Sequence, residues 1–222
     1  MMNGLNISIF TGNYGSGKTE MAINLALKSS EQNKKTILVD LDIVNPFYRL
    51  AEIKPYLEER EITVITPNFA TTNMDIPSLP ASIYSVFQMK NANVFFDVGG
   101  DEDGAIALGQ YKKYFDKIGY KMYFVINTRR PFTSNEEDII QLMKQVQNRS
   151  RLNISDLVNN TNLSYETTEE IILEGQKIID IVSQKTNLPV TYINAKKDIP
   201  LKLLTEYENK LLKIDLFMQP KF

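Results

Sequence analysis

The chain has 222 residues, a hydrophobic fraction of 43% and a net charge of −2, with 25 basic and 27 acidic residues. These values are typical of a globular protein and give no long-range attraction toward nucleic acid or anionic lipid. The chain has no cysteine and no histidine, which excludes disulfides, thiolate nucleophiles, cysteine-bound zinc, iron–sulfur clusters and histidine-based catalysis.

Strand-like and helix-like segments alternate along the chain. The apolar runs that predict buried strands are 5–10, 36–39, 62–65, 94–96, 122–126, 154–158 and 190–193. The helix-period segments are 18–32, 47–59, 79–89, 105–118, 135–147, 167–185 and an amphipathic stretch at 201–212. We expect capping boxes at Ser134 with Glu137 and at Thr167 with Glu170.

This alternation predicts an α/β fold, in which a mostly parallel sheet of about seven strands has helices on both faces. No internal repeat or flexible linker interrupts the pattern, so we expect residues 1–222 to form a single domain. The first residues do not resemble a secretion signal, and no segment approaches the ~20 apolar residues of a membrane span. The sequence therefore predicts a soluble cytoplasmic protein, without a nucleic-acid partner, and argues against a membrane partner.

The segment between the first predicted strand and the first predicted helix carries a phosphate-binding signature. It reads Gly-Asn-Tyr-Gly-Ser-Gly-Lys-Thr and matches G-x-x-x-x-G-K-S/T, the Walker A motif or P-loop. The glycines let the backbone curl so that N–H groups point at phosphate oxygens, and the helix N-terminus adds its positive dipole end. We expect Lys18 to contact the β- and γ-phosphates and the Thr19 hydroxyl to bind Mg²⁺. The predicted nucleotide-binding residues are Gly12, Asn13, Tyr14, Gly15, Ser16, Gly17, Lys18 and Thr19.

Three carboxylates follow later predicted strands, at the edge where the nucleotide is expected. Asp40 and Asp42 follow the second strand two residues apart, so either can bind a magnesium-bound water or orient the attacking water. Asp97 ends the apolar run 94–96 like a Walker B aspartate, and Gly99 and Gly100 after it can form a mobile switch loop. Helix caps and solvent-facing loop carboxylates are the alternative interpretations.

Together these motifs resemble the MinD, ParA and nitrogenase iron protein group of P-loop ATPases, which includes amidoligase-type CobB and CobQ domains. The resemblance rests on the P-loop, on Val39-Asp40-Leu41-Asp42 with Asn45-Pro46 after it, and on residues 97–101. It implies a three-layer P-loop NTPase sandwich that binds ATP and Mg²⁺. It further implies that Lys18 and Asp42 are catalytic and that Thr19, Asp40 and Asp97 hold the metal ion.

The resemblance also assigns a role to Asn160. Residues 157–161 are similar to the segment in which an asparagine of the family reads the base, and a turn asparagine is the alternative. Asn13 departs from the family, because it stands where the family has a signature lysine that reaches the partner subunit's phosphate. The sequence therefore leaves homodimerisation open, and the lack of cysteine excludes an iron–sulfur cluster.

Two functions and a binding-only alternative fit these features. The first hypothesis is a slow ATPase that acts as a nucleotide-dependent switch on a protein partner. The second is an ATP-dependent small-molecule kinase or ligase resembling dethiobiotin synthetase and CobB, with a substrate pocket between the 71–82 loop and Arg130. The third is a module that binds nucleotide without turnover. ATP is favoured over GTP because no Asn-Lys-x-Asp motif is present, and Arg129 and Arg130 form either a phosphate clamp or a solvated loop.

Overall fold

Eight parallel strands form one sheet in the computed structural model, which describes residues 4–42, 50–67, 81–100 and 102–218. Their order across the sheet is β3-β2-β4-β1-β5-β6-β7-β8. The strands are β1 (Asn6–Thr11), β2 (Lys35–Leu41), β3 (Ile62–Ile65), β4 (Ala92–Val98), β5 (Lys121–Ile126), β6 (Asp156–Asn159), β7 (Val190–Lys196) and β8 (Leu211–Ile214). The predicted α/β class and parallel sheet are confirmed, with eight strands in place of seven.

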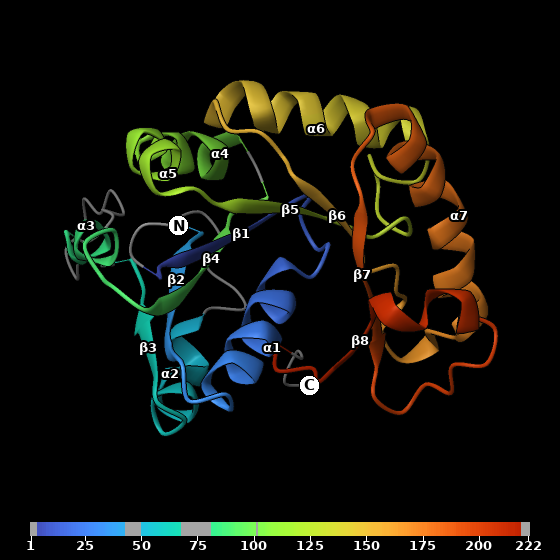
Figure 1. Ribbon diagram of the computed structural model, residues 1–222. Coiled ribbons are helices and arrows are strands. Elements are labelled where there is room, and N and C mark those ends of the chain that lie inside the picture. Colours follow the sequence, from blue (N-terminus) through green and yellow to red (C-terminus); the bar gives the residue numbers. More distant parts are fainter. Residues whose placement is uncertain (1–3, 43–49, 68–80, 101, 219–222) are drawn as a thin grey trace, which may run out of the picture.

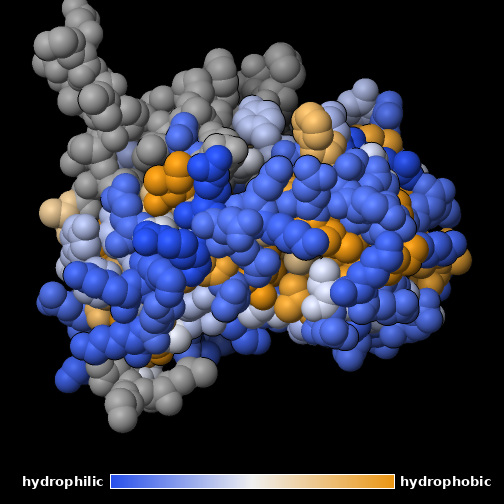
Figure 2. All heavy atoms as spheres, turned by 90° about the horizontal axis from the view of Figure 1, so that it is seen from above, coloured by the Kyte–Doolittle hydropathy of each residue, from blue (hydrophilic) through white to orange (hydrophobic). Residues whose placement is uncertain are grey.

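Helices cover both faces of the sheet (Figure 1). They are α1 (Lys18–Ser30), α2 (Leu50–Glu58), α3 (Ser82–Val86), α4 (Glu102–Gly109), α5 (Lys112–Ile118), α6 (Glu136–Ser150) and α7 (Glu169–Thr186), with 3₁₀ helices η1 (Ser164–Glu166) and η2 (Thr205–Lys210). The helices α1 and α2 lie on one face, and α4, α5 and α6 lie on the other. The surface over this second group is mainly hydrophilic, with small hydrophobic groups between polar residues (Figure 2).

Several predicted boundaries are wrong in informative ways. The expected helix 105–118 is split into α4 and α5 at Gly109, which packs closely against the end of α6, since an added Cβ there would lie 3.0 Å from the Ser150 carbonyl oxygen. The segment expected to be a final helix, 201–212, instead forms η2 and begins β8. Asn45-Pro46 and residues 71–80 of the predicted loop lie outside the described residues.

Both predicted helix caps are displaced by one residue. The side chain of Asn135 caps α6 by accepting a hydrogen bond from the Asp138 N–H at 2.9 Å, so Ser134 lies before the cap. Thr168 caps α7 in the same way, accepting from the Ile171 N–H at 3.5 Å. None of the described helices is long and apolar enough to span a membrane.

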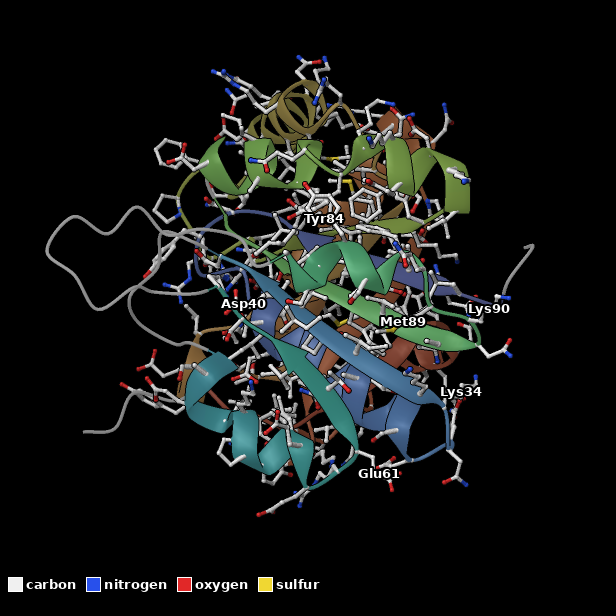
Figure 3. All side chains as sticks on the ribbon, turned by 90° about the vertical axis from the view of Figure 1, so that its left-hand side faces the viewer. Lys34, Asp40, Glu61, Tyr84, Met89 and Lys90 are labelled. Carbon is white, nitrogen blue, oxygen red and sulfur yellow. The ribbon has the colours of Figure 1, made fainter. Side chains whose placement is uncertain are left out.

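The parallel register brings the carboxyl ends of the central strands together. Phe10 of β1 aligns with Asp97 of β4, which in turn aligns with Asp40 of β2. Figure 3 shows Asp40 at one end of the sheet, whereas Lys34 and Glu61, which precede β2 and β3, lie at the opposite end. The residues that follow β1, β2 and β4 therefore lie close together at the carboxyl ends of these strands.

Phe10 anchors the strand that leads into this edge. Its ring is fully buried and stacks on Phe95 and Tyr123, with ring centroids 6.4 Å and 5.4 Å away. The stack joins β1 to both neighbouring strands, β4 and β5, on the face that α1 covers.

We predict that Phe10→Ala lowers the free energy of unfolding by about 3–5 kcal/mol, because it leaves a cavity in a close-packed core. Urea denaturation followed by circular dichroism measures this change. Tyr165→Ala is the control, since that side chain is 88% exposed, and it should change the same quantity by less than about 0.5 kcal/mol. Equal effects of the two substitutions would contradict the assignment of Phe10 to the core.

Candidate functional site

The P-loop turns from β1 into α1 through a backbone that requires glycine. Gly12, Gly15 and Gly17 have φ angles of 145°, 70° and 88°, which residues with a side chain rarely adopt. An added Cβ would lie 2.2 Å from the Val125 carbonyl oxygen at Gly12 and 2.0 Å from the Asn160 amide nitrogen at Gly17. These two glycines are therefore fixed by close approach as well as by backbone conformation.

The P-loop is held in place by hydrogen bonds to residues that follow neighbouring strands. The Asn160 amide nitrogen, just after β6, donates to the Ser16 carbonyl oxygen at 2.6 Å, and the Asn160 side-chain oxygen accepts from the Asn194 amide at 3.2 Å. The Asn13 amide nitrogen donates to the Pro131 carbonyl oxygen at 2.6 Å. The observed contacts of Asn160 thus position the loop, and base recognition by this residue stays a prediction.

Lys18 lies at the centre of the loop. Its side chain is buried, and its ammonium group donates to the Asn13 carbonyl oxygen at 3.0 Å. Gly100, three residues after Asp97, approaches the same group, since a Cβ at Gly100 would lie 2.8 Å from Lys18 Nζ and 2.6 Å from the Tyr14 backbone nitrogen. The P-loop and the segment after β4 are therefore in direct contact.

The structure brings the predicted carboxylates to this edge. The Asp40 carboxylate is buried and accepts from the Asp42 N–H at 2.9 Å, and Asp42 lines the cavity described below. Asp97 aligns with Asp40 in the ladder, and its side chain is hydrogen-bonded to Thr19. Within the described residues, no group of three or more carboxylates is close enough to form a metal cluster.

Asp97 carries a strongly perturbed carboxyl group. Burial raises the pKa of Asp97 to about 7, against the lowering effects of the Thr19 hydrogen bond and the Lys18 charge. Its Oδ1 is buried and has no hydrogen-bond partner in the described part of the chain. An orphaned carboxylate oxygen beside a threonine hydroxyl is the kind of donor set that Mg²⁺ prefers, so these residues fit a magnesium ion.

A cavity of about 490 Å³ extends from the P-loop along the carboxyl edge of the sheet. Its phosphate end is lined by Tyr14, Gly15, Lys18, Thr19, Asp42 and Arg130. Its far end is lined by Asn160, Asn162, Ser164, Thr167, Lys196, Ile214, Leu216 and Met218, among others. This volume is in the usual range for small-molecule and cofactor sites.

Part of the far end of the cavity comes from residues 214–218, which carry no sequence motif of a binding site. The Glu20 carboxylate, next to Thr19 in α1, accepts hydrogen bonds from the Phe217 and Met218 N–H groups at 2.7–2.9 Å. Asn24 and Asp215 exchange two further bonds, at 2.8 and 2.9 Å. Residues 215–218, the C-terminal strap, are thereby fixed to the helix that carries Lys18 and Thr19. No local pattern signals this contact, because its partners are about 200 residues apart in the sequence.

The geometry agrees with a match to a family model. Residues 7–196 match the model described as the CobQ/CobB/MinD/ParA nucleotide binding domain. The chain belongs to this family. The matched region of this CobQ/CobB/MinD/ParA domain begins in β1 and ends in β7, so it includes the P-loop, Asp40, Asp97 and Asn160. No curated protein sequence gives a significant match.

Solved structures of FtsY share the fold. The cell division protein FtsY of Thermotoga maritima is 16% identical, with a TM-score of 0.55 over 89% of this chain and 63% of that chain. The signal recognition particle receptor FtsY of Elizabethkingia anophelis in complex with GDP is 17% identical, with a TM-score of 0.54 over 96% and 60% of the two chains. The CobQ/CobB/MinD/ParA domain described here thus spans less than two thirds of the length of these structures.

The raised pKa of Asp97 predicts a pH-dependent stability. Because the folded state holds this proton more tightly than the unfolded state, the free energy of unfolding should fall as pH rises from about 4 to about 7. Asp97→Asn removes the buried charge, so it should flatten this decrease and raise the free energy of unfolding at pH 8 by about 2–4 kcal/mol.

Urea denaturation at pH 5 and pH 8, without nucleotide and with EDTA, measures both effects. The chain has no histidine, so the ordinary source of titration in this range is missing and the carboxylate effect is easier to resolve. If Asp97→Asn has the same free energy of unfolding at pH 8 as the parent, and the same change of that free energy between pH 5 and pH 8, burial of the Asp97 charge does not destabilise the fold.

Proposed function

We propose that the chain is a single Mg-ATP-binding domain of MinD/ParA type, comprising residues 1–222, which hydrolyses ATP slowly and acts as a nucleotide-dependent switch on a protein partner. The observation that carries this proposal is the contact of Gly100 with Lys18 and Tyr14. A phosphate group seated on the P-loop beside Lys18 has to meet the backbone at Gly100. The segment after β4 can therefore respond to the number of phosphates on the nucleotide.

The proposed site roles follow from positions at the phosphate end of the cavity. The N–H groups of residues 12–19 and the Lys18 ammonium would bind the β- and γ-phosphates. Thr19, Asp97 and Asp40, which aligns with Asp97 in the neighbouring strand, would hold Mg²⁺, and the ion would neutralise charge on the phosphates. Asp42 is proposed to orient the attacking water, because it lines the same cavity and follows β2 at the carboxyl edge.

ATP is proposed as the nucleotide, with GTP as the competitor to be tested. The sequence has no Asn-Lys-x-Asp guanine motif, and Asn160, the residue proposed to read the base, lines the cavity. GTP has to be measured in parallel, because one structural neighbour of low identity, an FtsY, is in complex with GDP.

A small-molecule kinase or ligase resembling dethiobiotin synthetase and CobB is the second candidate. The observation in its favour is the inward contact of Asn13, whose amide is bonded to the Pro131 carbonyl oxygen of the same chain at 2.6 Å. This side chain supplies no positive charge to a second subunit. Phosphate transfer within one chain is consistent with that arrangement, and a homodimer is not required for it.

Phosphate release from the purified protein with Mg-ATP, and separately with Mg-GTP, tests the proposal. Lys18→Ala should weaken nucleotide binding at least about tenfold in calorimetry, since it removes a buried charge-assisted contact. Asp42→Ala should keep binding within a few-fold and lower the hydrolysis rate about 10–100-fold. Lys28→Ala, an exposed lysine in the last turn of the same helix, is the control and should change neither quantity.

The outcomes separate the candidate functions. ATP binding with slow phosphate release that requires Asp42 supports the switch. Tight binding without phosphate release removes the catalytic role of Asp42 and favours either the kinase or ligase, which would need its substrate for turnover, or the module that binds without turnover. Failure of the parent protein to bind either nucleotide contradicts the proposal as a whole.

A further inference from the structure

Arg130 lies against the P-loop although it belongs to the loop that follows β5. Its Nε donates to the Gly15 carbonyl oxygen at 3.2 Å, and its side chain lines the phosphate end of the cavity beside Lys18 and Thr19. An added Cβ at Gly15 would lie 3.2 Å from that same nitrogen, so the glycine permits the approach. Among the described residues, no carboxylate is paired with Arg130, and its guanidinium is therefore not neutralised by an ion pair there.

The preceding arginine has a different environment. The Arg129 guanidinium forms an ion pair with Glu174 of α7, so this side chain joins two surface elements outside the phosphate end of the cavity. The two consecutive arginines therefore make different contacts: Arg129 pairs with α7, and Arg130 bonds to the P-loop. Arg129 is the matched control for any experiment on Arg130.

The loop that presents Arg130, residues 127–133, is fixed by buried polar groups. Asn127 is fully buried, and its side chain donates to the Asn162 carbonyl oxygen at 3.1 Å and accepts from the Arg129 N–H at 3.0 Å. The buried Thr133 hydroxyl donates to the Asn127 carbonyl oxygen at 2.7 Å. The backbone is therefore held on both sides of Arg130, so little backbone entropy is lost when the loop binds a ligand.

The same loop contains a strained residue. Phe132 has a φ of 63° although it is bulky, and its side chain is 74% exposed, so packing in the core does not compensate for this conformation. The bond from Asn13 to the Pro131 carbonyl oxygen holds the neighbouring backbone against the P-loop. A strained conformation kept beside a ligand cavity is consistent with a functional demand on the loop's shape.

We propose that Arg130 is a phosphate-positioning residue that contacts the phosphate chain of the bound nucleotide from within the same chain. This inference rests on the proposed nucleotide binding and adds a second positive charge to that of Lys18. A guanidinium group suits the task, because its planar set of donors matches phosphate oxygens while one nitrogen remains bonded to Gly15.

The test is calorimetric titration of the parent protein, residues 1–222, and of Arg130→Met, Arg130→Lys and Arg129→Met with Mg-ATP and Mg-GTP at two or more KCl concentrations. Arg130→Met keeps the apolar stem and removes the charge, so it should weaken binding about 10–100-fold at low salt. It should also reduce the salt dependence of the affinity, because one phosphate contact sensitive to ionic screening is lost. Arg130→Lys should recover part of the affinity and the salt dependence, and Arg129→Met should bind within about twofold of the parent.

Each other outcome counts against the proposal in a distinct way. If Arg130→Met binds like the parent, Arg130 does not contact the phosphates. If it binds weakly but keeps the parent's salt dependence, and Arg130→Lys is equally weak, the residue only supports the Gly15 carbonyl. If the parent binds neither nucleotide, the proposed function is wrong and the role of Arg130 is wrong with it. If the parent binds a nucleotide, the result for Arg130→Met tests the role of Arg130 alone.

Discussion

The site depends on the satisfaction of P-loop carbonyl groups by side chains from other parts of the sheet. A loop that turns its N–H groups toward a phosphate turns carbonyl oxygens away from it, and buried carbonyls need donors. Here Asn160 donates to the carbonyl oxygen of the buried Ser16 and Arg130 donates to that of the exposed Gly15, while the Asn13 side chain donates to the Pro131 carbonyl oxygen. The shape of the loop is therefore a property of the β5, β6 and P-loop strand ends together.

The buried carboxylate of Asp97 lowers the stability of the folded state. Asp97 is buried between β1 and β2, with one oxygen that has no partner in the described residues, and its pKa is raised accordingly. Folding alone does not favour such a group, because an apolar residue or an amide would be less costly to bury. A carboxylate in this position has a physical reason if it binds a cation. The cation would compensate the buried negative charge and would be held by Thr19 and Asp97 together.

Much of the fold and the phosphate end of the site could be predicted from the sequence, because their signals are local. Alternating apolar runs and helical segments predict the parallel sheet, and parallel strands place Asp40 and Asp97 at the same edge. The Walker A spacing predicts the glycine turn at residues 12–17. Each of these patterns lies within a few consecutive residues, so it can be recognised without knowing which distant residues it contacts.

The remaining features depend on contacts between distant residues. The Asn160 amide donates to the Ser16 carbonyl oxygen, a contact that no spacing rule encodes, and base recognition by this residue stays a prediction. The segment 201–212 has an amphipathic helical pattern, yet residues 211–214 pair with β7 and their alternate side chains, Leu212 and Ile214, are buried. Pairing with an existing sheet edge overrides local helix preference there, as tertiary contacts often do.

The attachment of residues 215–218 to Glu20 and Asn24 has a consequence for the order in which the molecule is made. The two halves of this contact are separated by 197 residues between Glu20 and Phe217, so the ribosome completes the P-loop long before the strap that closes the far wall of the cavity. A nascent chain with only the first strands lacks both the β5 and β6 strand ends that hold the P-loop and the residues Ile214, Leu216 and Met218 that line the far end of the cavity. Full ligand affinity is therefore expected only after β8 has paired and the strap has bound the first helix.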